Sequence, residues 1–334
     1  MTALLSFLLL LYTTAPIFAT GQPETPWERT VPQTPVPREA PAPAPSPPPP
    51  PPPPPEPLHL SIIPGFAEAE YHGYWIALGG AMERAVADNH AWRQRWALHL
   101  EYPNESHENE VDRQIAMVEE AIHRNPHGIV IVPLDAAALA PHLARAREEG
   151  IAVLIPPINH AHGGIVAGEM IGSPHPNEPV VVIGMNLPTR DHRAFGVRGV
   201  LGTSADIAYP MPSDEEAAYD LMWDLLSPPR EAQAVIALDY FTGRATVRAL
   251  IDMGKAGSVT TIVFDPFSPL QEYMESGIVD ATVVDPIDQI AASLVRGLLT
   301  SHNESDVSLA VPVLIRREDI HQREHDHLLR PYRQ

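Results

Sequence analysis

From Leu58 onward the chain alternates between strand-like and helix-like segments, and this alternation is the feature that most constrains the fold. The strand patterns are short apolar runs: "LHLSIIP", "GIVIVP", "GIAVLIP", "EPVVVIG", "AQAVIAL", "VTTIVF" and "DATVV". Between them, apolar residues recur at helical spacing, as in "VDRQIAMVEEAI" and "IDQIAASLVRGLL". Such alternation is typical of βαβ units, so we predict an α/β fold with parallel sheets covered by helices on both faces.

Length, charge and cysteine content narrow the class of protein. The chain has 334 residues, and its alternating part is longer than one sheet of this type usually needs, so we predict two Rossmann-like lobes. Lys and Arg number 22 against 42 Asp and Glu, with no basic run, which argues against a nucleic-acid partner. The chain has no cysteine, which excludes disulfides, thiolate metal sites, cysteine nucleophiles and a lipid-modified cysteine.

Residues 1–20 have the pattern of a secretory signal peptide. The apolar run "ALLSFLLLLY" is followed by "TTAPIFA", whose small residues suit cleavage near Ala19. The run is short for a membrane-spanning helix, which needs about 20 apolar residues. It is not preceded by Lys or Arg, so an uncleaved anchor stays open as an alternative. Either reading places the folded part in the periplasm, tethered or free.

Residues 21–57 form a proline-rich segment that we predict to be a disordered linker. It contains nine consecutive prolines, at positions 47–55. This composition buries no apolar core and favours the extended polyproline II conformation. The segment is either a stalk that crosses a crowded cell envelope or an extension without a function of its own.

The order of segments over the folded part resembles the periplasmic sugar-binding proteins of the ribose-binding type, which share their fold with the ligand domains of LacI-type repressors. The resemblance runs from about Leu60 to Ile315. It rests on "YW", "QIAMVEEAI", "GIVIVPLDAAALAPHLARAREEGIAVL", "NHAHGGIVAGEMI", "DHRAFGVRG", "AQAVIALDYFTGRATVRAL", "TTIVFDPFSPLQEYMESG" and "DATVVDPIDQIA" in this order. No single motif among them is diagnostic.

The resemblance implies two lobes joined by a hinge of three crossover strands. The N-terminal lobe would comprise residues 58–157 plus 286–312, and the C-terminal lobe residues 158–285 plus 313–334. The crossovers would lie at "PPIN", around Asp285 and near Pro312. A small ligand would bind between the lobes at the carboxyl ends of the strands, and the hinge would close on it.

The resemblance also indicates which side chains would contact the ligand. A sugar presents apolar faces and a rim of hydroxyls, which suit aromatic rings, carboxylates, amides and Arg. Arg193 opens "RAFGV", which is similar to the family's R-x-x-G-F pattern, and Asp265 follows "TTIVF" where the family has an aspartate. Trp75 also suits a position in the core. The predicted ligand-binding residues are His72, Tyr74, Trp75, Asn159, Arg193, Asp239, Asp265 and Asp285.

The chain departs from the family pattern at the first crossover. The strand "GIAVLI" leads in the family to an aspartate, whereas here "PPI" follows it, and roughly fifteen residues are absent between Pro157 and Asn159. One carboxylate of the family's site is therefore missing. This leaves open a polar ligand other than a standard pentose or hexose, or a site that has lost binding.

These observations predict a monomeric solute-binding protein that captures a small polar ligand, a sugar, for the membrane permease of an ABC transporter. The alternative is a ligand-binding partner of a membrane sensor or chemoreceptor. An enzyme on the same fold is disfavoured, because the chain has no G-x-S-x-G, Walker or G-x-G-x-x-G motif. His321 and His325 share the spacing of metal ligands but lack a third ligand, so we predict no metal and no cofactor.

Overall fold

The structure, a computed structural model, describes residues 53–65, 69–103, 109–172, 178–202, 207–299 and 309–329. The predicted signal peptide and the linker up to residue 52 lie outside the described residues. Contacts within the chain separate Met1–Pro52 from a compact unit, Pro53–Gln334, to which all described residues belong. Among these residues, no helix combines the length and the apolar character that a membrane span requires.

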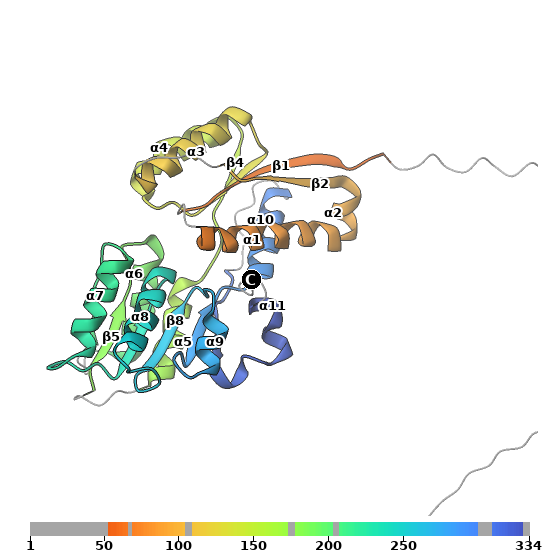
Figure 1. Cartoon of the computed structure of the whole chain (residues 1–334). Coiled ribbons are helices and arrows are strands. Elements are labelled where there is room, and N and C mark those ends of the chain that lie inside the picture. The colour runs from red at the N-terminus through yellow and green to blue at the C-terminus, as the bar shows by residue number, and fades with distance from the viewer. Residues whose placement is uncertain are drawn as a thin grey trace, which may run out of the picture. The chain divides into compact units, whose positions relative to one another are not determined.

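The first lobe contains a four-stranded parallel sheet (Figure 1), with the strand order β2-β1-β3-β4. Its strands are β1 (Glu56–Ile63), β2 (Trp96–Glu101), β3 (Gly128–Ile131) and β4 (Ala152–Leu154). All four residues of β3 are buried, as expected for a parallel strand with helices on both faces. β1 pairs with β2 from Glu56, so the predicted linker ends before Glu56 rather than at Pro57.

The described residues of the first lobe form the helices α1 (Ala69–Asp88), α2 (His90–Arg95), α3 (Glu110–Arg124), α4 (Ala136–Glu148) and α10 (Ile287–Leu299). α1 and α10 supply one apolar cluster with one face of the sheet, in which Leu78 and Leu294 are buried together with Leu60. α3 and α4 form a second apolar cluster with the other face of this sheet, around Met117 and Ile129. The last helix of this lobe thus comes from a segment that follows β5 to β9 of the second sheet in the sequence and precedes β10 (Val313–Arg316).

The second lobe contains a six-stranded sheet with the order β10-β9-β8-β7-β5-β6. Its strands are β5 (Val180–Ile183), β6 (Ile207–Ala208), β7 (Ala234–Ala237), β8 (Thr260–Phe264), β9 (Ala281–Val284) and β10 (Val313–Arg316). Neighbouring strands are parallel except for β10, which pairs antiparallel with β9. The sheet is therefore parallel with one antiparallel edge strand, a mixed arrangement common in doubly wound sheets.

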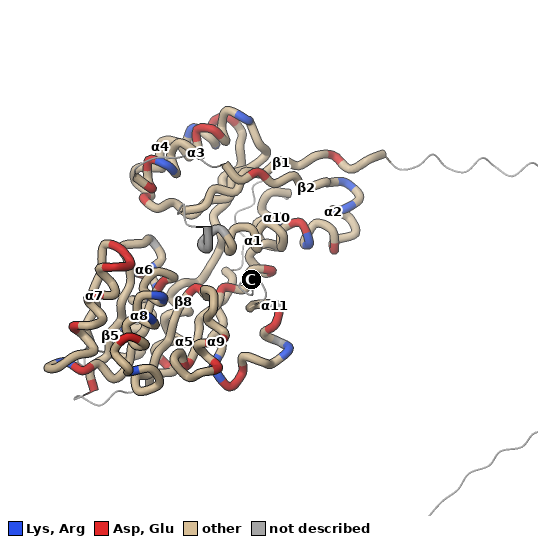
Figure 2. Tube along the Cα trace, viewed as in Figure 1, with Lys and Arg blue, Asp and Glu red and all other residues tan. Residues whose placement is uncertain are grey.

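Helices cover both faces of the second sheet. α5 (His160–Ile171) and α6 (Pro188–Leu201) form a core with one face, which includes Val182 and Ile236. The other face carries α7 (Glu215–Leu226), α8 (Tyr240–Asp252), α9 (Leu270–Glu275) and α11 (Asp326–Leu329), and two short 3₁₀ helices, Arg317–Asp319 and Arg323–His325, precede α11. On the helices of the second lobe Asp and Glu outnumber Lys and Arg, most clearly on α7, which has acidic residues and no basic one (Figure 2).

The first and third segments that join the two sheets lie side by side. Ile158 forms a parallel bridge with Ala310, Ala310 N–H donates to Pro157 O at 2.6 Å, and Asn159 N–H donates to Ala310 O at 2.8 Å. Proline has no N–H, so Pro156 and Pro157 contribute only their carbonyls here. "PPIN" is thus a short joint that is held by an isolated bridge to the third crossover rather than by a strand of either sheet.

Candidate functional site

Three aspartates lie at one edge of the second sheet. Asp265 and Asp285 directly follow β8 and β9, and Asp239 follows β7 by one intervening residue. Because β7, β8 and β9 are adjacent and parallel, their carboxyl ends share this edge. Arg193, on α6, reaches the same place and contacts Asp265 and Asp285. We call Arg193, Asp239, Asp265 and Asp285 the Arg193 cluster; it unites four of the eight predicted residues.

Arg193 is the centre of this cluster. Its Nη1 donates to Asp265 Oδ2 at 2.6 Å and its Nη2 to Asp265 Oδ1 at 2.8 Å, the bidentate geometry of a strong Arg–carboxylate pair. Nη1 also donates to Leu238 O at 2.6 Å, and the guanidinium lies 4.7 Å from the centre of the Phe264 ring. These contacts fix the guanidinium plane at the edge of the sheet.

The electrostatics of Arg193 follow from its burial among carboxylates. The exposed fraction of its side chain is only 4%. Burial alone would lower its pKa, but the charges of Asp265, Asp285 and Asp239, with the hydrogen bonds to Asp265, outweigh burial and raise that pKa. Asp265 itself has a φ of 54°, in the left-handed region where non-glycine residues are uncommon and often functional.

Asp239 has a structural role within the site. As the N-cap of α8 it accepts a hydrogen bond from Thr242 N–H at 2.9 Å through Oδ1, and its Oδ2 accepts one from Met185 N–H at 2.8 Å. Burial raises the pKa of Asp239, and the two N–H donors counteract this only in part. This carboxylate joins the loop after β5 to the start of α8.

Asp285 differs from the other two aspartates because none of the described residues donates a hydrogen bond to its carboxyl group. Its side chain is 9% exposed, its Oδ2 lies 3.9 Å from Arg193 Nη2, and no hydrogen bond reaches it from the described residues. Burial raises the pKa of Asp285 to about 7; Arg193 acts in the opposite direction and Asp265 reinforces the rise. A buried carboxyl group with unused acceptor capacity is suited to bind a donor from outside.

His160 is a site residue that the sequence did not reveal. It is the first residue of α5, and its buried Nδ1 has no hydrogen-bond partner among the described residues. Burial, with smaller contributions from Arg193 and His192, lowers the pKa of His160 to about 3. The imidazole is therefore neutral near pH 7 and adds a polar atom, without a charge, beside the Arg193 cluster.

The other predicted residues lie elsewhere. Asn159 caps α5, where its Oδ1 accepts from His162 N–H at 3.1 Å, and it belongs to the joint with Ala310. Tyr74 is half-buried on α1 and meets the Trp75 ring edge-on, at a centroid distance of 5.4 Å. His72 lies outside the residues whose side chains are described.

The structure places Trp75 in the core, one of the two positions expected for it, and not at a surface that a ligand could contact. Its exposed fraction is 1%, and it packs in the core between α1, α10 and the first sheet. An indole so enclosed by apolar side chains presents no face to a ligand. We therefore assign Trp75 to the core and leave it out of the proposed site.

The position of Arg193 depends on the close packing of α5 against α6. A Cβ atom added at Gly164 would overlap Arg193 O, and one added at Gly196 would overlap Ala161 O. Only glycine allows the two backbones to approach so closely. The glycines of "HAHGG" and "AFGV" thus set where α6 lies and, through it, where the guanidinium reaches.

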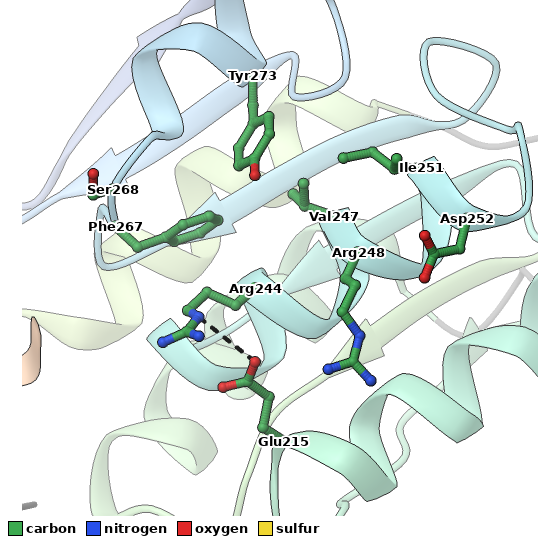
Figure 3. Close-up of a pocket in the computed structure, with 9 residues that line it drawn as sticks. All are labelled: Glu215, Arg244, Val247, Arg248, Ile251, Asp252, Phe267, Ser268 and Tyr273. Carbon is green, nitrogen blue, oxygen red and sulfur yellow. Dashed lines mark ion pairs between the residues drawn. The ribbon is translucent and has the colours of Figure 1, made fainter. Parts of the chain in front are cut away.

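A pocket of about 260 Å³ lies on the face of the second sheet that carries α7, α8 and α9 (Figure 3). This face is opposite to the one that carries α6 and Arg193. The pocket's two arginines are already engaged: Arg244 Nε lies 3.5 Å from Glu215 Oε1, and Arg248 makes two bonds to Glu216, at 2.7 and 2.8 Å. We assign it no ligand. It is lined by Glu215, Arg244, Val247, Arg248, Ile251, Asp252, Phe267, Ser268 and Tyr273.

A second pocket, of about 560 Å³, borders the hinge. It combines α5 and β10 of the second lobe with Gln289 on α10 of the first, and Val311 and Pro312 of the third crossover form part of its wall. Its shape therefore depends on the hinge. Within the described residues, no group of three His, Asp or Glu side chains is arranged to hold a metal ion.

Comparison with known proteins supports this architecture. The family profile described as periplasmic binding protein domain matches residues 67–155. No curated protein matches the chain. Among solved structures, an ABC transporter solute-binding protein from Agrobacterium vitis, bound with α-D-tagatopyranose, has a TM-score of 0.69 at 16% identity and covers 81% of this chain and 98% of that one.

Two further structures give the same picture. GanP, a glucose-galactose binding protein from Geobacillus stearothermophilus, has a TM-score of 0.65 at 15% identity, over 79% of this chain and 99% of that one. A chain of the XylFII–LytSN complex has a TM-score of 0.62 at 17% identity, over 79% and 100%. At such identities the likeness establishes the fold. The chain therefore has the two-lobed α/β fold of the type I periplasmic binding proteins, which confirms the fold predicted from its sequence.

Proposed function

We propose that the protein is an extracytoplasmic solute-binding protein that captures a small polar ligand, a sugar, between its lobes and delivers it to an ABC transporter. The observation that carries the proposal is the Arg193 cluster at the carboxyl edge of the second sheet. Open α/β sheets bind ligands at this edge, and clustered carboxylates with a fixed guanidinium suit a ring of hydroxyl groups. The solved structures of this fold cited above include proteins bound to or described as binding sugars.

The mechanism we infer is reversible capture without covalent chemistry. Arg193 and Asp265 would hold hydroxyls by charge-assisted hydrogen bonds, Asp239 and Asp285 would border the same ligand, and Asn159, Tyr74 and His72 would approach it when the hinge closes. The crossover pair Ile158–Ala310 supplies the pivot. Each ligand bond would make the closed form more stable than the open one.

A thermal-shift screen of the full chain against pentoses, hexoses, polyols and other polar metabolites tests the proposal. A ligand present at 100 times its Kd stabilises the folded state by about 2.7 kcal/mol, which is readily seen as a higher Tm. We expect a shift with at least one sugar or polyol, and its loss in Asp265→Asn. A shift that survives Asp265→Asn would place the site elsewhere, and silence across all sugars and polyols would contradict the proposal.

A second role uses the same site with a different partner. A solved complex, XylFII–LytSN, contains a chain of this fold, so we also consider ligand delivery to a membrane sensor. Uptake of the labelled ligand separates the two roles. Loss of uptake in cells that lack the protein supports the transporter; unchanged uptake with a lost transcriptional response supports the sensor.

A further inference from the structure

The charges of the candidate site do not balance among the described residues. Arg190 borders the cluster, because its Cγ and Asp239 Oδ2 both line the space beside Gly184. Its Nη1 pairs with the exposed Asp191 Oδ1 at 2.7 Å, and its buried Nε has no hydrogen-bond partner among the described residues. Among the described residues, Arg193 is the cation that pairs with Asp265 and Asp285, and no ion pair joins Arg190 to any of the three aspartates Asp239, Asp265 and Asp285. His160 contributes no charge near pH 7, because its pKa is lowered to about 3.

Of these three aspartates, Asp285 is the one whose carboxyl group has no hydrogen-bond donor among the described residues. Asp265 is neutralised by the bidentate bonds of Arg193, and Asp239 accepts two backbone N–H groups. Asp285 is more than nine-tenths buried, and the described residues offer it only Arg193 Nη2 at 3.9 Å, beyond hydrogen-bond distance. A buried carboxylate in this state is costly unless something else pairs with it.

The corresponding edge of the first sheet does not supply the missing cation from its described residues. Arg113 lies there, beside the segment that follows β1, and donates to Gly65 O at 2.8 Å and to Glu110 Oε2 at 2.6 Å. Asp135, after β3, is an acid and caps α4. Closure of the lobes would therefore bring no spare positive charge to Asp285 from these residues.

We propose that the ligand carries a protonated amine, as an amino sugar or amino polyol does, and that its ammonium group binds Asp285. This inference rests on the proposed function and names its substrate class. An ammonium group supplies a positive charge and three N–H donors, whereas a hydroxyl supplies one donor and no charge. The same excess of carboxylates disfavours sugar acids.

The titration of Asp285 agrees with this assignment. Its raised pKa means that the carboxyl group takes up a proton more easily than an exposed aspartate does, and this proton neutralises it. An ammonium group would replace that proton. Arg193 lowers the pKa of Asp285 and Asp265 raises it. His160 on α5 also lies within reach of Arg193 and of His192 on α6.

Matched pairs of ligands test the inference on the full chain. Isothermal titration at pH 7 would compare glucosamine with glucose, galactosamine with galactose, and mannosamine with mannose; N-acetylglucosamine serves as a neutral derivative of equal shape at the ring. We expect at least one amino sugar to bind 10-fold or more tightly than its parent. Asp285→Asn should reduce this ratio to about one. Asp224→Asn, an exposed change on α7 that removes the same charge, should leave the ratio unaltered.

The outcomes separate this inference from the proposed function. If a neutral sugar binds as tightly as its amino derivative, the amine assignment is wrong while sugar capture stands. If Asp285→Asn keeps the 10-fold preference, Asp285 is not the partner of the amine. If none of these sugars binds and no polyol stabilises the chain, the proposed function fails and this inference with it. Thermal unfolding of each variant verifies that it is folded.

Discussion

Arg193 is buried together with the carboxylates that neutralise it, so its removal should affect folding as well as binding. Arg193→Ala leaves Asp265 and Asp285 without their cation, and breaking a buried pair in this way costs about 3–5 kcal/mol. Asp265→Asn should cost less, because its side chain is 31% exposed and the amide oxygen still accepts a hydrogen bond. Urea unfolding of both variants measures the difference, and equal losses would contradict this account.

Asp285 should make stability depend on pH. Its pKa rises from 3.8 to about 7 on folding, so the folded protein holds this proton more tightly than the unfolded chain does. Between about pH 4 and 7 the contribution of Asp285 to the free energy of unfolding therefore falls as pH rises, and it is constant above that window. Asp285→Asn lacks the contribution. His160, whose lowered pKa acts in the opposite direction, is common to both proteins and cancels in their comparison.

Urea unfolding of the wild type and of Asp285→Asn at several pH values measures this effect. The wild type should lose stability relative to the variant as pH rises from 4 to 7. A difference that does not change with pH would mean that Asp285 titrates as it does in an unfolded chain.

At the scale of single residues, the sequence allows us to predict the position of side chains that directly follow a strand. Asp265 and Asp285 could be placed because a strand pattern ends immediately before each, and parallel strands share one edge. Their mutual contact through Arg193 supports the selection, although their role in binding stays a prediction. His160 was missed because a histidine that begins a helix gives no signal of burial. Trp75 was ambiguous because apolar spacing alone does not distinguish a core residue from a ligand contact.

The packing of α5 on α6 allows a prediction for whole elements. Gly164→Ala places a methyl group against Arg193 O, so α6 has to move and the bond from Arg193 to Asp265 has to lengthen. We expect a loss of stability of about 1–3 kcal/mol, as for other overpacked cores, and weaker ligand binding. The control is Gly199→Ala on the exposed side of α6, where an added Cβ meets no atom within 4 Å.

Gly199→Ala should stabilise the helix by about 0.5–1 kcal/mol, because alanine restricts the unfolded chain more than glycine does. Thermal unfolding, with binding of the ligand found by the screen, distinguishes the two variants. If both variants gain stability, the backbones of α5 and α6 are not in contact at Gly164.

Element by element, the strongly periodic segments were predictable and the weak ones were not. β3, β7, β8 and β9 are short apolar runs in the sequence and are buried strands in the structure. β2, at "WALHLE", lies at the edge of its sheet and is mostly half-buried, so its pattern is faint. α2 is only six residues long, too short to show a period. β10 pairs antiparallel with β9 because of the route that the chain takes back from α10. The local sequence pattern of β10 does not indicate this direction.

At the scale of the molecule, the first lobe is built from two distant stretches of chain. Without α10, Leu60, Trp75 and Leu78 lose the apolar partners Ile290 and Leu294. A chain that ends at Pro286 should therefore expose this core, and limited proteolysis should degrade residues 53–157 faster than in the full chain. A chain that ends at Arg316 keeps α10 and β10 and is the control. Equal resistance of residues 53–157 in both would show that the first lobe folds without α10.

The same interleaving affects the timing of synthesis. During translation the helix that completes the first core is made only after β5 to β9 of the second sheet, so for most of that time the N-terminal stretch has no complete core into which to collapse. A protein that has to cross a membrane as an extended thread benefits from this delay. If this protein is exported, as the proposed function requires, the late position of α10 would keep its N-terminal stretch unfolded for most of its synthesis.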